Sequence, residues 1–229
     1  MDYRLLNKVT IANVMPLLII LIIHNKMRGK KLFSQFDIRW GYDNIQIAEG
    51  DQWKTGFKTT HRVFQSNVMN FGLCNAPATF SQMGVNVFKP LMDQYLEECD
   101  YYMDNFGIFT NDTQTGIERH RLITTEFLQI CLDHSLFLCP KKCIFEQPEM
   151  DFLGFHICNG KILVDPSKIS GIWDYTEQLN NITKVRKFLG IVGYQRPFIQ
   201  DFVRIAQPLH NLTKKNIKYK WTEKHTEAL

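Results

Sequence analysis

Residues 100–109 read Asp-Tyr-Tyr-Met-Asp-Asn-Phe-Gly-Ile-Phe, and the rest of the chain is organised around this stretch. Apolar and aromatic residues flank the polar step Asp104-Asn105, a pattern that predicts a β-hairpin with its tight turn at that step. A hairpin tip would hold the Asp104 carboxylate out from the sheet, where it could present a metal ion to a substrate. Because Asp and Asn are the commonest turn residues, the stretch taken alone more often indicates an ordinary solvated turn.

A second carboxylate occurs inside another apolar stretch. Residues 32–38 read Leu-Phe-Ser-Gln-Phe-Asp-Ile and predict a β-strand in which Phe36 and Ile38 flank Asp37. A carboxylate in such a strand must be paired or must bind a cation, because burying it alone costs too much free energy. Asp37 is therefore a candidate for either an ion pair or a metal site.

Helices and further strands are predicted around these two segments. Gly72 gives a loop its backbone freedom, Asn75 is a candidate N-cap, and Pro77 suits the first turn of a helix. Apolar spacing predicts helices at residues 76–98, 118–134, 167–175 and 183–194, and strands at 44–47, 53–59, 136–138 and 143–145. A second hairpin is expected about Asn159-Gly160.

Composition and charge narrow the class of protein. The chain has 229 residues, 45% of them hydrophobic and 22% charged, which indicates a globular domain with a full core rather than a disordered or collagenous chain. Residues 36–160 hold nine lysines and arginines against sixteen acidic residues, whereas both flanking regions are basic. An acidic centre between basic flanks would suit a nucleic-acid enzyme that uses metal ions, although chance variation of solvated faces explains the charges equally well.

Neither the cysteines nor the apolar segments indicate a secreted or membrane protein. The six cysteines form no Cys-x-x-Cys pair, and the spacing of Cys139, Cys143, His134, His156 and Cys158 fits no standard zinc module. We therefore expect free thiols in a reducing compartment. The most apolar run, residues 17–23, is much shorter than the ~20 residues that a membrane span requires.

Five motifs together resemble the reverse transcriptases of gypsy-type LTR retrotransposons and their retroviral relatives. They are DYRLLNKVT (residues 2–10), FSQFDIRWGY (33–42), FGLCNAPATF (71–80), YMDN (102–105) and FLGFHI (152–157). A later stretch, FLGIVGYQRPFI (188–199), is similar to the family's segment after the palm. The resemblance covers essentially the whole chain.

The resemblance implies an α/β fold of the right-hand polymerase type, with an antiparallel palm sheet backed by helices, a partial fingers region and a helical thumb. We expect fingers and palm at residues 1–164, a thumb-like helical region at 165–208, and the start of a connection or RNase H-like region at 209–229. It further implies that fingertip residues precede Asp2 and that the RNase H module lies mainly beyond Leu229, so that the chain is a fragment.

The implied reaction is the template-directed extension of a primer. In this phosphoryl transfer, two Mg²⁺ ions about 3.5–4 Å apart stabilise the attacking and leaving oxygens. By the resemblance, Asp37 and Asp104 bind metal, and Asn105 occupies the third catalytic position. The residues implied to bind the nucleotide are Ile38, Arg39, Tyr42, Phe71 and Gly72. Those implied to bind primer or template are Met103, Phe152, Leu153, Gly154, Lys184, Arg186 and Lys187.

The implied partners are an RNA or DNA template-primer and deoxynucleoside triphosphates. The resemblance implies an intracellular location, in a cytoplasmic particle or the nucleus, with no membrane association. It leaves the oligomeric state open.

The chain departs from the family pattern at its most informative motif. The family hairpin has the form YxDD, and here Asn105 replaces the second aspartate. A neutral amide offers a carbonyl oxygen but carries no charge to hold Mg²⁺, so we expect polymerase activity to be severely reduced or absent. Asn70 and Pro197 also stand where the family has proline and arginine. The alternative hypothesis is a nucleic-acid-binding relic without catalysis, whose basic flanks retain affinity for a template-primer.

Overall fold

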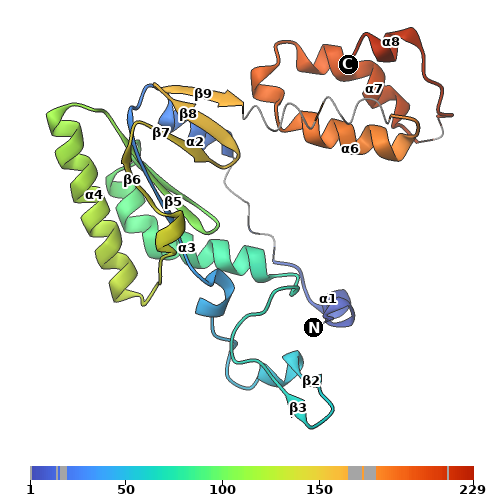
Figure 1. Cartoon of the computed structure of the whole chain (residues 1–229). Helices are drawn as coiled ribbons and strands as arrows, with labels where there is room; N and C mark the ends of the chain where they lie inside the picture. Colours follow the sequence, from blue (N-terminus) through green and yellow to red (C-terminus); the bar gives the residue numbers. More distant parts are fainter. Residues whose placement is uncertain (1, 14, 16–19, 165–171, 173–178, 216) are drawn as a thin grey trace. The chain divides into compact units, whose positions relative to one another are not determined.

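A four-stranded antiparallel sheet forms the centre of the amino-terminal part of the chain. Its strands lie in the order β4 (Cys99–Tyr102), β5 (Asn105–Thr110), β1 (Leu32–Asp37) and β6 (Ile144–Gln147). Figure 1 labels β5 and β6 of this sheet. The strand expected at residues 32–38 and the hairpin expected at residues 100–109 are both confirmed. Six consecutive residue pairs between β1 and β5 join this strand to the hairpin.

The computed structural model describes all residues except 1, 14, 16–19, 165–171, 173–178 and 216. The chain has two compact units. The first consists of residues 1–153 and 157–162, and the second of residues 154–156 and 163–229.

The hairpin turn lies one residue earlier than the sequence pattern predicts. Tyr102 pairs with Asn105, so the two turn residues are Met103 and Asp104, and Asn105 is the first residue of β5. Met103 adopts a left-handed backbone conformation with φ of 56°. Asp104 therefore lies at the tip, as expected, whereas Asn105 is held by the sheet.

Two helices cover one face of the sheet. They are α3 (Ala76–Gln94) and α4 (Gln114–Asp133), which Figure 1 shows alongside the strands. The core between them and the sheet is aromatic, and the ring centroids of Phe106 and Phe127 lie 4.3 Å apart. Helix α3 ends four residues earlier than expected, because Tyr95 leaves the helical conformation.

The opposite face of the sheet is covered by α2 (Ile20–Met27) and by strand β7 (Glu149–Phe152). Phe33, Phe109 and Phe152 are buried together in this second core. The apolar run at residues 17–23 therefore contributes a helix from Ile20 onward, while residues 17–19 lie outside the described part of the chain.

Strand β7 belongs to a second sheet of three strands, β7-β8-β9, with β8 at Phe155–Cys158 and β9 at Lys161–Val164. The predicted turn at Asn159-Gly160 is confirmed, because both residues have positive φ, of 51° and 69°.

The region between β1 and α3 has less regular structure than the sequence predicts. It contains the 3₁₀ helices η1 (Gly41–Asn44) and η2 (Gln52–Thr55) and a small hairpin of β2 (Phe57–Lys58) and β3 (Val63–Phe64). The strand expected at residues 44–47 is reduced to an isolated bridge between Gln46 and Val68. Alternation of apolar residues was a poor guide here, because it does not show whether a partner strand exists.

The first motif is tied to the third by a side-chain amide. In α1 (Arg4–Val9), Asn7 donates from Nδ2 to the Gly72 carbonyl over 2.8 Å and accepts from the Cys74 amide over 2.9 Å. Asn75 does not cap α3 with its side chain, which instead donates to the Ile11 carbonyl over 2.9 Å. Asn75 is therefore the N-cap residue of α3, as expected, but its side chain makes no capping hydrogen bond.

The carboxy-terminal unit contains α6 (Ile182–Gly193), η4 (Arg196–Phe198), α7 (Phe202–Leu212) and α8 (Glu223–Thr226). Its core holds Val185, Phe188 and Leu209. The helix expected at 183–194 is confirmed, and the side chain of Asn181 caps it by accepting from the Lys184 amide over 3.0 Å. The helix expected at 167–175 falls on residues of which the structure describes only Ile172.

None of the helices in the described part of the chain is long and apolar enough to cross a bilayer.

One buried histidine connects α4 to the sheet. His120 is fully buried and lies 2.7 Å from the Ser34 hydroxyl on β1 and 3.0 Å from the Thr110 hydroxyl on β5. The Ser34 hydroxyl also accepts from the Glu146 amide of β6 over 2.9 Å. Burial lowers the pKa of His120 to about 4, so this histidine is neutral in the folded protein at neutral pH.

This pKa predicts a loss of stability in acid. The unfolded chain binds a proton at His120 near pH 6.5, whereas the folded chain does so only near pH 4, so the stabilising effect is complete above pH 6.5 and is lost as the pH falls toward 4. We expect the contribution of His120 to the free energy of unfolding to fall by about 2 kcal/mol between pH 7 and pH 5. Urea unfolding at several pH values, followed by circular dichroism, measures the free energy of unfolding as a function of pH.

The variant His120→Gln should be less stable at pH 7 and should show a flatter pH dependence. Buried His24, whose pKa is also lowered by burial, will keep part of the slope. Exposed His61→Gln is the matched control and should retain the wild-type profile. Parallel pH profiles for the wild type and His120→Gln would contradict the assignment.

Candidate active site

The pairing of β1 with β5 places Asp37 directly opposite Asn105. The amide of Ile38 donates to the Asp104 carbonyl over 2.7 Å, and the amide of Cys139 donates to the Asp37 carbonyl over 2.8 Å. The backbone at Asp37 is thus held from both sides. The structure therefore brings together the three residues expected to be catalytic, Asp37, Asp104 and Asn105.

Asp37 already has a cationic partner. The Lys142 ammonium lies 2.9 Å from the Asp37 carboxylate, which is 9% exposed in its side chain, whereas the Lys142 side chain is 63% exposed. Lys142 ends the 3₁₀ helix η3 (Pro140–Lys142). The hydrogen bond to Asp37, supported by the charges of Asp37 and Asp104, raises the pKa of Lys142.

Sequence reasoning missed Lys142. It is 105 positions from Asp37 in the chain, so no local pattern connects the two residues. The only available signal was the pair Lys141-Lys142 within the acidic middle of the sequence.

The Asn105 amide is held at both ends. Its Nδ2 donates to the Asp104 carboxylate over 3.0 Å, and its Oδ1 accepts from Gln35 Nε2 over 2.8 Å. Because an ionised carboxylate only accepts hydrogen bonds, Asp104 requires the NH₂ group of Asn105 to face it. The carbonyl oxygen that Asn105 could offer to a cation is therefore engaged by Gln35.

The donor set fits one divalent cation better than two. Asp37 and Asp104 are hard oxygen donors, as Mg²⁺ prefers. Among the residues that the structure describes, neither belongs to a group of three acidic, histidine or cysteine side chains whose ligand atoms could reach one ion. A second ion would have to rely on the Asn105 amide, which carries no charge.

Of the residues expected to bind the nucleotide, Tyr42 lies near Asp104 and Phe71 packs against Tyr42. The centroids of these two rings lie 4.6 Å apart, and burial together with the nearby Asp104 charge raises the pKa of the Tyr42 phenol. Gly72 has a φ of 97°, as expected for its loop. Ile38 is buried, whereas the exposed Arg39 guanidinium stacks over the Trp40 ring at 3.8 Å.

The residues expected to bind primer or template are more dispersed. Met103 lies in the hairpin turn, where its Sδ accepts from the Ser81 hydroxyl over 3.2 Å. Phe152 is buried in the second core, and Leu153 beside it is half-buried. Gly154 has a φ of 82° and belongs to the carboxy-terminal unit.

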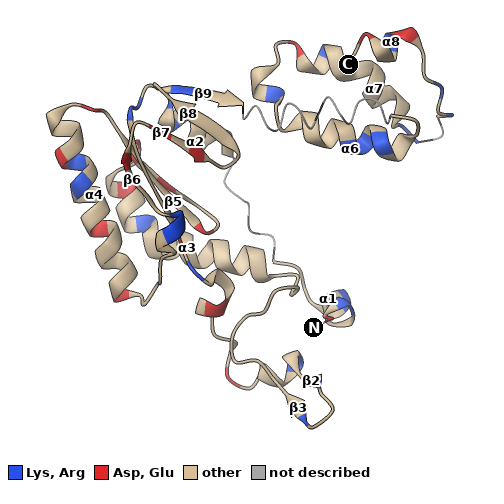
Figure 2. Ribbon diagram, viewed as in Figure 1, with Lys and Arg blue, Asp and Glu red and all other residues tan. Residues whose placement is uncertain are grey.

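Lys184, Arg186 and Lys187 also lie in the carboxy-terminal unit, on the first two turns of α6, where Figure 2 shows a basic segment. Arg186 donates to the Thr213 carbonyl over 3.0 Å and so connects α6 with the end of α7.

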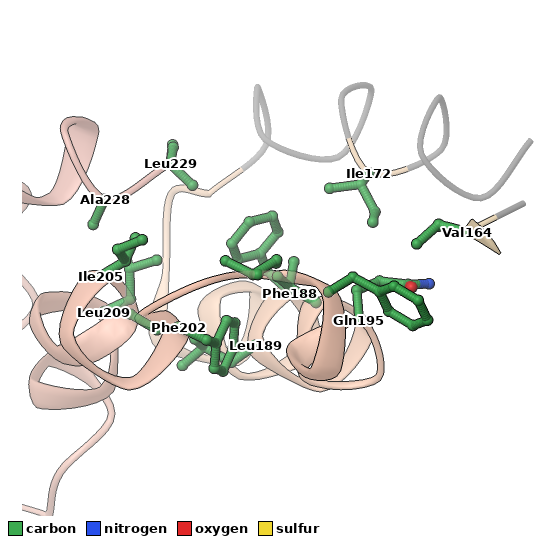
Figure 3. A pocket seen from close by; sticks show the side chains of 14 residues that line it. Val164, Ile172, Phe188, Leu189, Gln195, Phe202, Ile205, Leu209, Ala228 and Leu229 are labelled. Atoms are coloured by element: carbon green, nitrogen blue, oxygen red, sulfur yellow. The ribbon is translucent and has the colours of Figure 1, made fainter. Parts of the chain in front are cut away.

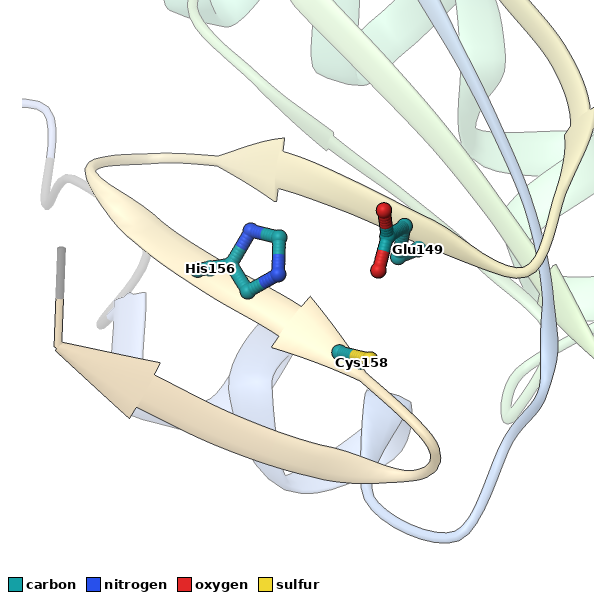
Figure 4. Close-up of side chains that lie close together, drawn as sticks. All are labelled: Glu149, His156 and Cys158. Carbon is teal, nitrogen blue, oxygen red and sulfur yellow. The ribbon is translucent and has the colours of Figure 1, made fainter.

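Figure 4 shows a cluster outside this site, formed by Glu149, His156 and Cys158 on strands β7 and β8. Cys139 and Cys143 are not part of it. The hydrogen bond to Glu149 raises the pKa of the Cys158 thiol, which favours the protonated form over the thiolate that a metal ion would bind.

A cavity of about 450 Å³ lies within the carboxy-terminal unit. Figure 3 shows the side chains that line it. Among the described residues that line it, Gln195 has the only polar side chain. The described side chains that line this cavity therefore include no acid, base or nucleophile.

An antiparallel sheet backed by two helices, with carboxylates at the end of one strand and at a neighbouring hairpin tip, is the palm of a right-hand nucleic-acid polymerase. The model of the family "Reverse transcriptase (RNA-dependent DNA polymerase)" matches residues 1–157. The chain belongs to the reverse transcriptase family.

Related proteins support this assignment. The Transposon Tf2-7 polyprotein of Schizosaccharomyces pombe is 31% identical over 228 residues, which is 100% of this chain and 16% of the polyprotein. The Transposon Tf2-3 polyprotein of the same organism is 30% identical over the same length. The chain thus spans 16% of the length of these relatives.

Solved structures confirm the expected fold class. A foamy viral protease-reverse transcriptase in complex with an RNA/DNA hybrid is 23% identical with a TM-score of 0.76, over 99% of this chain and 30% of that one. A second structure of that enzyme, in complex with double-stranded DNA, has a TM-score of 0.81 at 23% identity and covers 99% of this chain and 39% of that one.

Proposed function

We propose that this chain is the reverse transcriptase segment of a gypsy-type LTR retrotransposon polyprotein, and that its reaction is RNA-directed DNA synthesis by template-directed transfer of nucleotides to a primer. The single observation that carries the proposal is the pairing of Asp37 with Asn105, which brings the Asp37 carboxylate to the hairpin that bears Asp104. Residues 1–164 would act as fingers and palm, 165–208 as thumb, and 209–229 as the start of a connection or RNase H-like region.

The side chains around the site have separable roles in this proposal. Asp37 and Asp104 would hold a divalent cation, which supplies a Lewis acid for the attacking and leaving oxygens. Tyr42, which packs against the Phe71 ring, would stack under the deoxyribose of the incoming triphosphate and exclude a 2′-hydroxyl. The Phe71–Gly72 step would pack on the nucleotide, and Phe71 is 76% exposed, so its ring is accessible to a ligand.

Asn105 limits the reaction in this proposal. Its NH₂ group faces Asp104 and its carbonyl faces Gln35, so it adds neither charge nor a free oxygen to the metal site. An aspartate at this position would still accept from Gln35 and would supply the missing negative charge.

Primer extension by the variant Asn105→Asp tests this role. With Mg²⁺ or Mn²⁺ and an RNA template carrying a DNA primer, we expect the variant to extend at least about tenfold faster than the wild type, because the added carboxylate strengthens metal binding. Gel analysis of the extended primers gives the rates.

The matched control is Asn86→Asp on α3, an exposed position where the carboxylate would keep the hydrogen bond from Gln82. It should extend primers at the wild-type rate. Equal rates for the wild type and Asn105→Asp would refute a limiting role of Asn105. Binding of the template-primer without extension by either protein would favour a non-catalytic nucleic-acid binder.

The basic residues of α6 should bind the phosphate backbone. Replacing Lys184 and Lys187 with Gln removes two positive charges, and we expect affinity for an RNA/DNA hybrid to fall and the slope of log K against log salt to decrease by about 1.5 to 2. Arg186 is left in place because it connects α6 with the Thr213 carbonyl. Fluorescence anisotropy at several salt concentrations measures the slope.

The control replaces exposed Lys214 and Lys215 with Gln, which changes the net charge equally. It should leave most of the salt slope intact. A loss of affinity that is the same for both double variants would mean that net charge, rather than α6, governs binding.

A further inference from the structure

A lysine side chain binds the carboxylate at the centre of the palm. The Lys142 ammonium contacts Asp37 at 2.9 Å, and the Asp37 side chain is nearly inaccessible to solvent. A charged carboxylate at such a site needs a cationic or hydrogen-bonding partner. Lys142 supplies this partner from within the chain.

The backbone that carries this lysine is held in place beside Asp37. Lys142 follows Pro140 in a short 3₁₀ helix, and its amide donates to the Cys139 carbonyl over 2.9 Å. Cys139 in turn donates from its own amide to the Asp37 carbonyl. The same short segment that presents the Lys142 side chain is therefore bound to the backbone of Asp37.

The second carboxylate also has a partner, but of a different kind. Asp104 accepts from the Asn105 amide, which is neutral, and Gln35 holds that amide in place. Of the two contacts, only the one at Asp37 brings a full positive charge to the site. A divalent cation would therefore compete with the Lys142 ammonium for the Asp37 carboxylate.

We propose that Lys142 is a built-in counter-cation of the palm, which a divalent metal ion has to displace from Asp37 in order to bind. This inference rests on the proposed metal-binding role of Asp37 and Asp104. In this inference Lys142 competes with the metal ion for Asp37, so that Lys142 as well as Asn105 would weaken metal binding. The Lys142 side chain can move away without disturbing the core, because most of it is exposed.

Binding of Mn²⁺ to the whole chain, followed by the loss of the free-ion signal in electron paramagnetic resonance, tests the competition. We expect Lys142→Met to bind Mn²⁺ about tenfold more tightly than the wild type, because one positive charge is removed from the site. Lys142→Arg keeps the charge and should stay within about twofold of the wild type. Asp37→Asn should abolish the gain when combined with Lys142→Met.

Lys141→Met is the matched control. Lys141 lies in the same turn, is exposed, and has no ion pair with any residue that the structure describes. It should bind Mn²⁺ as the wild type does, which separates displacement at Asp37 from a general effect of net charge. Circular dichroism of each variant confirms that it is folded.

Two results would overturn the proposal. Equal or weaker Mn²⁺ binding by folded Lys142→Met would show that Lys142 does not compete, and an equal gain in Lys141→Met would show that only net charge matters. Primer extension by Asn105→Asp reports on the proposed polymerase function separately. If the chain extends primers but Lys142→Met does not change Mn²⁺ binding, the polymerase function stands and this inference fails. If Lys142→Met binds Mn²⁺ more tightly but neither the wild type nor Asn105→Asp extends primers, this inference stands and the polymerase function fails.

Discussion

The register between β1 and β5 is the constraint on which the rest of the structure depends. Phe36 pairs with Phe106 on the face covered by the helices, while Phe33 pairs with Phe109 on the opposite face. A slip of one residue would turn every one of these side chains to the wrong face, so the two cores fix the register together. Asp37 and Asn105 are brought opposite each other as a consequence of core packing.

The same register explains the polar contacts of the site. Gln35 faces Gly107 across the strands, and the absence of a side chain there leaves Gln35 room to lean toward Asn105 on the same face. A Cβ atom on Gly107 would lie 3.1 Å from the buried Phe152 ring, so the glycine also allows the second core to approach the sheet. The absence of a side chain at Gly107 thus favours both the packing of the second core and the contact between Gln35 and Asn105.

Much of this architecture could be predicted from the sequence, because the relevant signals are local. The strand at Asp37, the hairpin and the helix with Ile123 and Phe127 on its buried side all have strong periodicity, which depends only on neighbours in the chain. The hairpin tip was placed one residue late because Asn105, a typical turn residue, pairs with Tyr102 instead. Asn75 was assigned to the helix it precedes, whereas its side chain binds a segment more than sixty positions earlier.

The contacts that decide the chemistry of the site are non-local, and for that reason the sequence alone did not reveal them. The Lys142–Asp37 and Gln35–Asn105 pairs join positions 105 and 70 residues apart. A basic or amide side chain has the same appearance in a sequence whether it faces solvent or a carboxylate. Only the fold shows that Asp37 and Asp104 each have a partner from the chain itself.

The link from Asn7 to the Gly72–Cys74 loop has a practical consequence for spectroscopy. Cys74 is the one exposed cysteine among the six, and its backbone amide takes part in that link. A thiol-reactive fluorophore would therefore react first at this loop, a few residues from Phe71 in the sequence. Its emission would follow ligand-dependent rearrangements of the loop in real time, without the need to introduce a foreign cysteine.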